Sequence, residues 1–378
     1  MKRLPGLISI LLCCVLLSGC WNYRGLDDID IVTGIAVDRD GTQGPYHLTF
    51  EIIDMEASGE AKGSAVLYVE AEGETLFDAI RNSKKKLINK LYGGNMQTLI
   101  ISRQIAQTEG VLGILEQLLR DGEPRESISI VISQEETAKD ILLTKGIDSK
   151  IISYEIHEMV EEDNRVTASV INMPLYRAYN AIKGTGNALA LSAMRCVQNG
   201  EETVVEGNGI ALFQGDRLTD FLTPEKTKFY LFAVDEIEGS VISFPVSRPN
   251  DSISMEVKDS KTKTKVDYHD GQLTISLDIK TKLNVMETKS QINLSQAQQR
   301  RELERLTEAY LEQHITDFFQ EVQLQYQRDI FGLGRLLYQK DPGLWRSLEP
   351  VWDELFQNAV IEVRAKAVIL SSGVLKNY

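Results

Sequence analysis

The sequence of 378 residues has few of the side chains that build metal and catalytic sites. It contains only four histidines, His47, His157, His269 and His314, which lie far apart along the chain. None of them belongs to an H-x-x-x-H or H-E-x-x-H arrangement, which places two zinc ligands on one face of a helix. The sequence therefore predicts no metal site and no cofactor.

The motifs of common enzyme classes are also missing. The sequence has no G-x-S-x-G nucleophile elbow and no G-x-x-x-x-G-K-[ST] phosphate loop. Two glycine-containing stretches remain, Gly184–Asn187 (GTGN) and Phe331–Gly334 (FGLG). The first lacks the third glycine and the preceding strand of a dinucleotide site, so we interpret it as a turn. The second is either an anion cradle or a helix break. We predict no catalytic residue and no enzymatic activity.

Positive charge is in short supply. Lysine and arginine number 41 against 55 acidic residues, which gives a formal net charge of −14. Phosphate contacts need clustered basic residues, so the composition argues against nucleic-acid binding. One basic run, 258–268, alternates lysine with threonine and other polar residues. We expect either that this run faces lipid phosphates or that it is a solvated edge strand whose lysines hinder pairing with another chain.

No apolar run is long enough to cross a bilayer, which takes about 20 residues. The longest is the stretch of 14 residues from Leu4 to Leu17, and it follows the basic pair Lys2-Arg3. This combination is typical of a cleavable signal peptide, which we assign to residues 1–19. Without Lys2 and Arg3 the mature chain carries a formal charge of −16.

Cysteine is scarce, and its placement argues against disulfides. Cys13 and Cys14 are removed with the signal peptide, so only Cys20 and Cys196 remain in the mature chain. We expect Cys196 to be a small buried apolar residue. Leu17-Ser18-Gly19-Cys20 resembles the lipobox of bacterial lipoproteins. That resemblance implies a diacylglyceryl group on Cys20 and cleavage before it. Two or three acyl chains would then hold the protein on a bilayer. The alternative is an ordinary signal peptide with a cysteine by chance.

The rest of the chain alternates strand and helix patterns. Strands and helices follow one another through the first half, which predicts a sheet covered by helices. Asn199-Gly200 predicts a hairpin turn. Residues 273–285 alternate apolar and polar side chains, which is typical of a strand with one solvent-exposed face. A helix of about thirty residues follows from Ser295. Trp345 and Trp352 are seven residues apart on one helical face, where they are core residues or a partner-docking surface.

Two stretches together resemble a known family. The first is 18–41, SGCWNYRGLDDIDIVTGIAVDRDG, and the second is 329–373, in which D-x-F-G-x-G precedes D-P-x-L-W and W-D-E-x-F. Both resemble the Ger(x)C family, the C subunits of spore germinant receptors. The central segments 98–133 and 157–179 are similar to that family as well, so the resemblance covers nearly the whole mature chain.

The resemblance implies a fold, partners and a location. It implies an α+β protein of three consecutive domains, each a mixed or antiparallel sheet packed with helices. We place them at 20–186, at 187–250 for a small middle domain, and at 251–378. It also implies a lipoprotein on the outer face of the spore inner membrane, working beside integral A and B subunits. Cys20 is the one functional position that carries over.

Two other functions stay open at this point. A solute-binding lipoprotein of a transport system would need two similar lobes, and no internal duplication is visible. A lipoprotein enzyme acting on the cell wall would need paired carboxylates or a Cys/His site, which the sequence does not offer convincingly.

Overall fold

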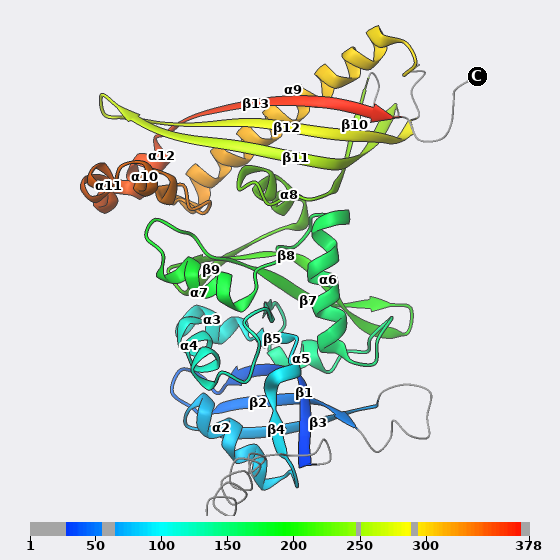
Figure 1. Cartoon of the computed structure of the whole chain (residues 1–378), viewed down its shortest axis with the longest axis vertical. Coiled ribbons are helices and arrows are strands. Elements are labelled where there is room, and N and C mark those ends of the chain that lie inside the picture. The colour runs from blue at the N-terminus through cyan, green and yellow to red at the C-terminus, as the bar shows by residue number, and fades with distance from the viewer. Residues whose placement is uncertain (1–27, 55–64, 247–250, 289–293, 372–378) are drawn as a thin grey trace, which may run out of the picture.

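A computed structural model describes residues 28–54, 65–246, 251–288 and 294–371 of the protein. The expected signal peptide, 1–19, and Cys20 lie outside these residues. Within the described part, the strands form two sheets (Figure 1). The larger sheet occupies the N-terminal end of the long axis and the smaller sheet the C-terminal end.

The larger sheet is mixed, with strand order β3-β2-β1-β5-β6-β7-β8-β9 and β4 paired to the start of β1. Its centre is parallel, from β1 through β5 and β6 to β7, while both flanks are antiparallel. The central strands β5 (TLII) and β6 (SIVIS) are buried at every residue, as expected for parallel strands covered on both faces. The strands are β1 (Ile29–Arg39), β2 (Tyr46–Asp54), β3 (Ala65–Gly73), β4 (Lys90–Tyr92), β5 (Thr98–Ile101), β6 (Ser129–Ser133), β7 (Ala190–Asn199), β8 (Glu202–Gln214) and β9 (Arg217–Leu222).

Helices cover both faces of this sheet. On one face α5 and α6 pack Ile141, Ile156 and their neighbours against Ala36, Ile100 and Val131. The other face and the smaller sheet share one continuous apolar core, to which α2, α3, α4, α7 and α8 contribute. These helices are α2 (Leu76–Asn82), α3 (Arg103–Thr108), α4 (Leu112–Asp121), α5 (Ala138–Leu142), α6 (Ile152–Val166), α7 (Leu175–Lys183) and α8 (Pro224–Ala233).

The smaller sheet has strand order β10-β11-β12-β13. A long hairpin, β11 and β12, forms its centre and turns at Asp270-Gly271, where both residues have positive φ as a tight hairpin turn requires. The last strand, β13, runs parallel to β12. One face of the sheet packs on α9 and the helices that follow it. These elements are β10 (Ser240–Pro245), β11 (Ser252–His269), β12 (Gln272–Thr288), α9 (Ala297–Glu321), α10 (Gly334–Lys340), α11 (Pro342–Leu348), α12 (Trp352–Gln357) and β13 (Val360–Ser371).

Carboxylates of α9 occupy the outer edge of β13. The peptide N–H groups of Ala365, Ala367 and Ile369 donate to glutamate oxygens at 2.8, 3.1 and 3.1 Å. The three acceptors are Glu312, Glu308 and Glu304, one helical turn apart. We call this set the glutamate ladder. It gives the edge strand hydrogen-bond partners that a fifth strand would otherwise provide.

The α+β class with sheets packed by helices is confirmed. The three domain borders stay a prediction, and the structure adds one fact about them. Strands β7, β8 and β9 of the expected middle domain continue the N-terminal sheet, because β7 pairs with β6. Strand β10 of the same segment pairs instead with β11 of the C-terminal sheet. Among the described residues, the segment 187–250 therefore shares its strands between two sheets.

Candidate functional site

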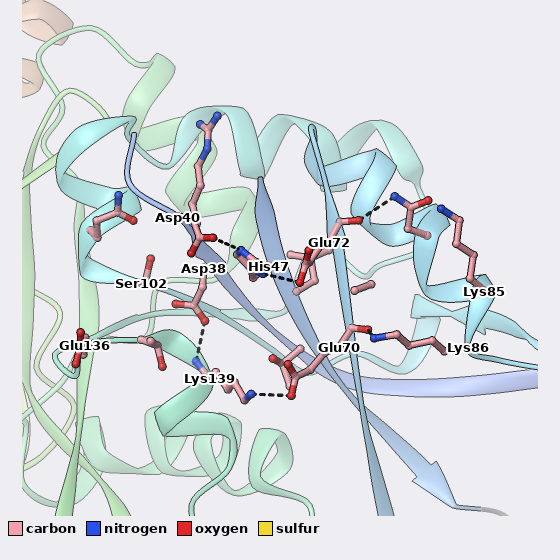
Figure 2. Close-up of a pocket in the computed structure, with 17 residues that line it drawn as sticks. Asp38, Asp40, His47, Glu70, Glu72, Lys85, Lys86, Ser102, Glu136 and Lys139 are labelled. Carbon is pink, nitrogen blue, oxygen red and sulfur yellow. Dashed lines mark hydrogen bonds and ion pairs between the residues drawn. The ribbon is translucent and has the colours of Figure 1, made fainter. Parts of the chain in front are cut away.

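A cavity of about 630 Å³ opens at the edge of the larger sheet where β1 and β5 end. We call it the edge pocket (Figure 2). Parallel strands that diverge at such an edge leave a crevice beyond their carboxyl ends, the usual place of ligand sites in open sheets. The lining comes from the end of β1, from β2 and β3, from the starts of α3 and α5, and from Asn82, Lys85 and Lys86 at and after the end of α2.

Asp38, the penultimate residue of β1, reaches across this edge to α5. Its two carboxylate oxygens accept hydrogen bonds from the peptide N–H groups of Ala138 (2.7 Å) and Lys139 (3.0 Å). Removal from water raises the pKa of Asp38 above its ordinary value, while the two N–H donors act in the opposite direction. The carboxylate therefore fixes the start of α5 against β1.

Acidic side chains approach a histidine and a lysine across the pocket. His47 Nε2 lies 2.9 Å from an oxygen of Asp40, and His47 Nδ1 lies 3.5 Å from an oxygen of Glu72. Lys139 Nζ lies 2.6 Å from Glu70. Acidic and basic groups thus alternate around the opening, an arrangement suited to a small polar or zwitterionic molecule.

Two hydroxyl groups of the pocket serve as helix caps. Ser102 Oγ accepts from the peptide N–H of Ile105, and Thr137 Oγ1 accepts from that of Asp140. Neither hydroxyl is held by a general base, as an activated nucleophile would be. The lining therefore supports recognition better than covalent chemistry.

Two further features of the described residues concern metal binding and membrane crossing. No group of three or more His, Cys, Asp and Glu side chains in that part of the chain is arranged to hold a metal ion. None of its helices combines the length and the apolar character that crossing a bilayer demands.

The D-x-F-G-x-G stretch, residues 329–334, forms a network of hydrogen bonds around Asp329. One oxygen of Asp329 accepts from the peptide N–H of Phe331 at 3.0 Å. The other accepts from Gly334 N–H at 2.9 Å and from the indole Nε1–H of Trp352 at 3.0 Å. We call these four residues the Asp329 clasp. The group that the glycine-containing stretch cradles is thus the carboxyl side chain of the same motif, and burial raises the pKa of this carboxyl while the hydrogen bonds from its donors lower it.

The residue that follows Gly334 of the clasp also connects α10 to the turn between α7 and β7. Arg335 N–H donates to the carbonyl of Gly186 at 2.8 Å, so the predicted GTGN turn contacts the start of α10. A methyl group at Gly334 would lie 2.5 Å from the ring of Trp345, which leaves room for glycine alone. The ring of Phe331 stacks on Phe319 with centroids 4.2 Å apart.

Both candidate docking residues lie inside this region. Trp345 is 3 % exposed and Trp352 is 6 % exposed, and their rings meet edge to face at 5.2 Å. This burial agrees with the core alternative. A docking role for the short helices that carry them stays a prediction.

The other residues singled out from the sequence are scattered. Cys196 is partly buried on β7, and burial raises the pKa of its thiol to about 11, with the nearby carboxylates of Glu135 and Asp140 adding to the effect. His157 accepts or donates a hydrogen bond with Ser129 at 2.8 Å, and His314 packs against the rings of Phe229 and Tyr310. The basic run 258–268 forms most of β11, with Lys261, Lys263 and Lys265 exposed.

Sequence reasoning missed the edge pocket and the role of Asp329. Asp38 and Asp40 surround Arg39 at the end of a predicted strand, and acidic residues at a carboxyl end are a usable signal. Asp329 stands two residues before an N–H that it binds, which is the pattern of an Asx turn.

Comparisons with known proteins find matches over the length of the chain. A family model described as "Spore germination protein N-terminal domain" matches residues 22–195. A second, "Spore germination B3/ GerAC like, C-terminal", matches residues 208–373. Spore germination protein KC of Bacillus subtilis (strain 168) is 21 % identical over 392 residues, covering 98 % of this chain and 96 % of that protein.

Two further matches agree. Spore germination protein GerQC of Bacillus cereus is 25 % identical over 371 residues, covering 97 % of this chain and 98 % of its own. The crystal structure of the GerBC protein superposes with a TM-score of 0.59 at 17 % identity. It covers 89 % of this chain and 97 % of that one, and it shows that the two share a fold.

Proposed function

Because this chain belongs to the spore germination B3/GerAC-like family, we propose that it is the non-catalytic lipoprotein subunit of a spore germinant receptor. In this role it acts in nutrient-triggered germination through contacts with integral membrane A and B subunits. The observation that carries the proposal is the extent of the match. Both family models fit, and the relatives align over nearly the whole of either chain.

The non-catalytic role is supported by the chemistry of the edge pocket. Asp38, Asp40 and Glu70 are engaged by helix N–H groups, a histidine and a lysine, and the hydroxyls of Ser102 and Thr137 cap helices. A subunit that works by contact needs stable surfaces instead of a reacting group. The acyl chains on Cys20 would confine these surfaces to the outer face of the spore inner membrane. Confinement raises the effective concentration of partners, so modest contacts hold a complex.

Fractionation of spores tests the anchor. We expect Cys20→Ala to leave folded protein that no longer sediments with membrane at high salt, where charge attraction alone does not hold a protein on lipid, and spores that germinate poorly. Cys196→Ala is the matched control, since it removes the other cysteine of the mature chain and should leave both properties unchanged. Normal membrane fractionation and normal germination of Cys20→Ala spores would contradict the anchor.

Purification from spore membranes tests the partners. We expect the lipidated protein, extracted in mild detergent, to carry integral A and B subunits with it. Recovery of a solute transporter in their place would contradict the receptor assignment.

A solute-binding lipoprotein is the second candidate, and the edge pocket is the observation in its favour. Its volume and alternating charges would suit an amino acid. Calorimetric titration of the protein with amino acids and sugars separates the two functions. Tight binding that Asp40→Ala and Glu72→Ala abolish would favour the solute-binding function.

A further inference from the structure

The segment 84–92 lies at the end of the molecule from which the N-terminal stretch leads to Cys20. Strand β4 runs beside the first residues of β1, with Lys90 opposite Ile29 and Tyr92 opposite Ile31. Figure 1 shows β4 and β3 at the end opposite the smaller sheet. An extended chain from Cys20 to Asp28 spans at most about 30 Å. We call residues 84–92 the lysine loop.

The lysine loop carries positive charges that are not held in ion pairs with described carboxylates. Lys84, Lys85 and Lys86 are all exposed, and Lys85 and Lys86 also line the rim of the edge pocket, which contains acidic residues. The ammonium of Lys84 donates to the carbonyls of Leu87, Ile88 and Asn89, and that of Lys86 donates to the carbonyl of Glu70 at 2.8 Å. Carbonyl oxygens bear no formal charge, so three positive charges stay on this surface. Within the part of the chain that the structure describes, none of the three lysines forms an ion pair, whereas Lys90 pairs with Glu123.

The same loop presents apolar side chains to solvent. Ile88 is 94 % exposed, and the three bonds from Lys84 hold the backbone around it in place. Tyr92 is 41 % exposed, and Leu67 on the adjoining edge strand β3 is 50 % exposed. An apolar tip between lysines is the combination that binds at a lipid interface, where aliphatic groups enter the headgroup boundary and lysines meet phosphates.

We propose that the lysine loop rests on an anionic lipid surface. The contact orients the molecule with β3 and β4 toward the bilayer and the smaller sheet away from it. This orienting role rests on the Cys20 anchor proposed above, whereas the lipid contact itself does not depend on it. The overall negative charge does not oppose the contact strongly, because charges beyond about 8 Å are screened at physiological ionic strength.

Cosedimentation of the unlipidated chain with vesicles tests the contact. The chain from residue 21 onward retains every strand and helix of the two sheets, and circular dichroism verifies its folding. We expect it to bind vesicles of phosphatidylglycerol and not vesicles of phosphatidylcholine, with binding lost at high salt. Since a lysine near an anionic surface contributes about fivefold in affinity, Lys85→Gln with Lys86→Gln should weaken binding about thirtyfold.

Two matched controls separate the loop from general charge. Lys263→Gln with Lys265→Gln makes the same charge change on β11, in the smaller sheet at the other end of the molecule, and should alter binding less than twofold. Ile88→Ser should weaken binding, while Leu324→Ser, at a residue 75 % exposed in the C-terminal part, should not.

Two results would overturn the inference. One is equal weakening by the two lysine pairs, and the other is equal or absent binding to both lipids. Either result leaves the anchor untouched, because Cys20-dependent membrane fractionation of the native protein is measured separately. Membrane fractionation that persists at high salt in Cys20→Ala spores would instead contradict the anchor alone.

Discussion

Replacing Asp329 tests whether the D-x-F-G-x-G motif is a structural clasp. Asp329→Asn keeps the size of the side chain and exchanges one acceptor oxygen for an NH₂ group. In the better of its two orientations, the remaining oxygen accepts from Gly334 and Trp352, and the NH₂ group faces the N–H of Phe331. Asp329→Ala removes all three acceptor contacts.

The magnitudes follow from the donors left without partners. A donor left unsatisfied away from water costs about 1–3 kcal/mol, and a hydrogen bond to a charged group contributes about 1.5–3 kcal/mol. Asp329→Asn leaves one donor unsatisfied and weakens two bonds, so we expect a loss of about 2–3 kcal/mol in the free energy of unfolding. Asp329→Ala should cost more, about 3–5 kcal/mol.

Urea unfolding followed by tryptophan emission measures the effect, because Trp345 and Trp352 lie in and beside the clasp. Asp341 provides the matched control. Its exposed carboxylate accepts from Gly343 N–H at 3.0 Å and Leu344 N–H at 2.9 Å as the cap of α11. Asparagine caps helices as well as aspartate does, so Asp341→Asn should cost less than about 1 kcal/mol. Equal losses at the two positions, or an unchanged midpoint for Asp329→Ala, would refute the reasoning.

Three further predictions address packing, helix capping and titration. Gly334→Ala should lower the free energy of unfolding by about 1–3 kcal/mol, because the added methyl group clashes with Trp345. Gly113→Ala has open space at its position in α4 and should raise the free energy of unfolding by about 0.5–1 kcal/mol. Urea unfolding of the two variants measures the difference. Glu51 is fully buried and accepts hydrogen bonds from the N–H groups of Ile152 and Ser153 at 2.8 and 3.0 Å. Glu51→Ala should therefore lower the free energy of unfolding by about 2–4 kcal/mol and speed hydrogen exchange at the start of α6. Unchanged exchange there would contradict this prediction. Burial raises the pKa of Cys196 to about 11, so the folded state favours the neutral thiol. The stabilisation that the neutral thiol gives the folded state is present below the unfolded pKa of about 8.5, and it is lost as the pH rises toward 11. At pH 8 a thiol reagent should therefore modify Cys196 roughly two orders of magnitude more slowly in folded protein than in urea, and equal rates would refute the assignment.

Local patterns in the sequence predicted the elements whose environment is uniform along their length. The alternation in 273–285 predicted β12, because one face of that strand is buried throughout. Asn199-Gly200 predicted the turn between β7 and β8. The apolar residues of 74–92 recur with a helical period, but this stretch is not one helix. Helix α2 ends at Asn82, the ammonium of Lys84 then binds three loop carbonyls, and Leu91 belongs to β4.

Local sequence patterns could not predict the features that depend on pairing between strands distant in the sequence. The edge pocket needs Asp38, His47 and Glu70, which three strands bring together through their register. The pairing of β7 with β6, which places strands on both sides of residue 186 in one sheet, has no local signal either. The tryptophan spacing was compatible with two roles because periodicity identifies a face without telling what covers it.

The glutamate ladder has a consequence for protein held at high density on a surface. Neighbouring copies in such a layer collide often, and an open strand edge would let one copy extend the sheet of another. Three amide hydrogens of β13, those of Ala365, Ala367 and Ile369, already have acceptors from α9 and are not available for this pairing. Copies can therefore be crowded side by side without fusing through this edge, and contacts between subunits can be made by side chains instead of by exchanged strands.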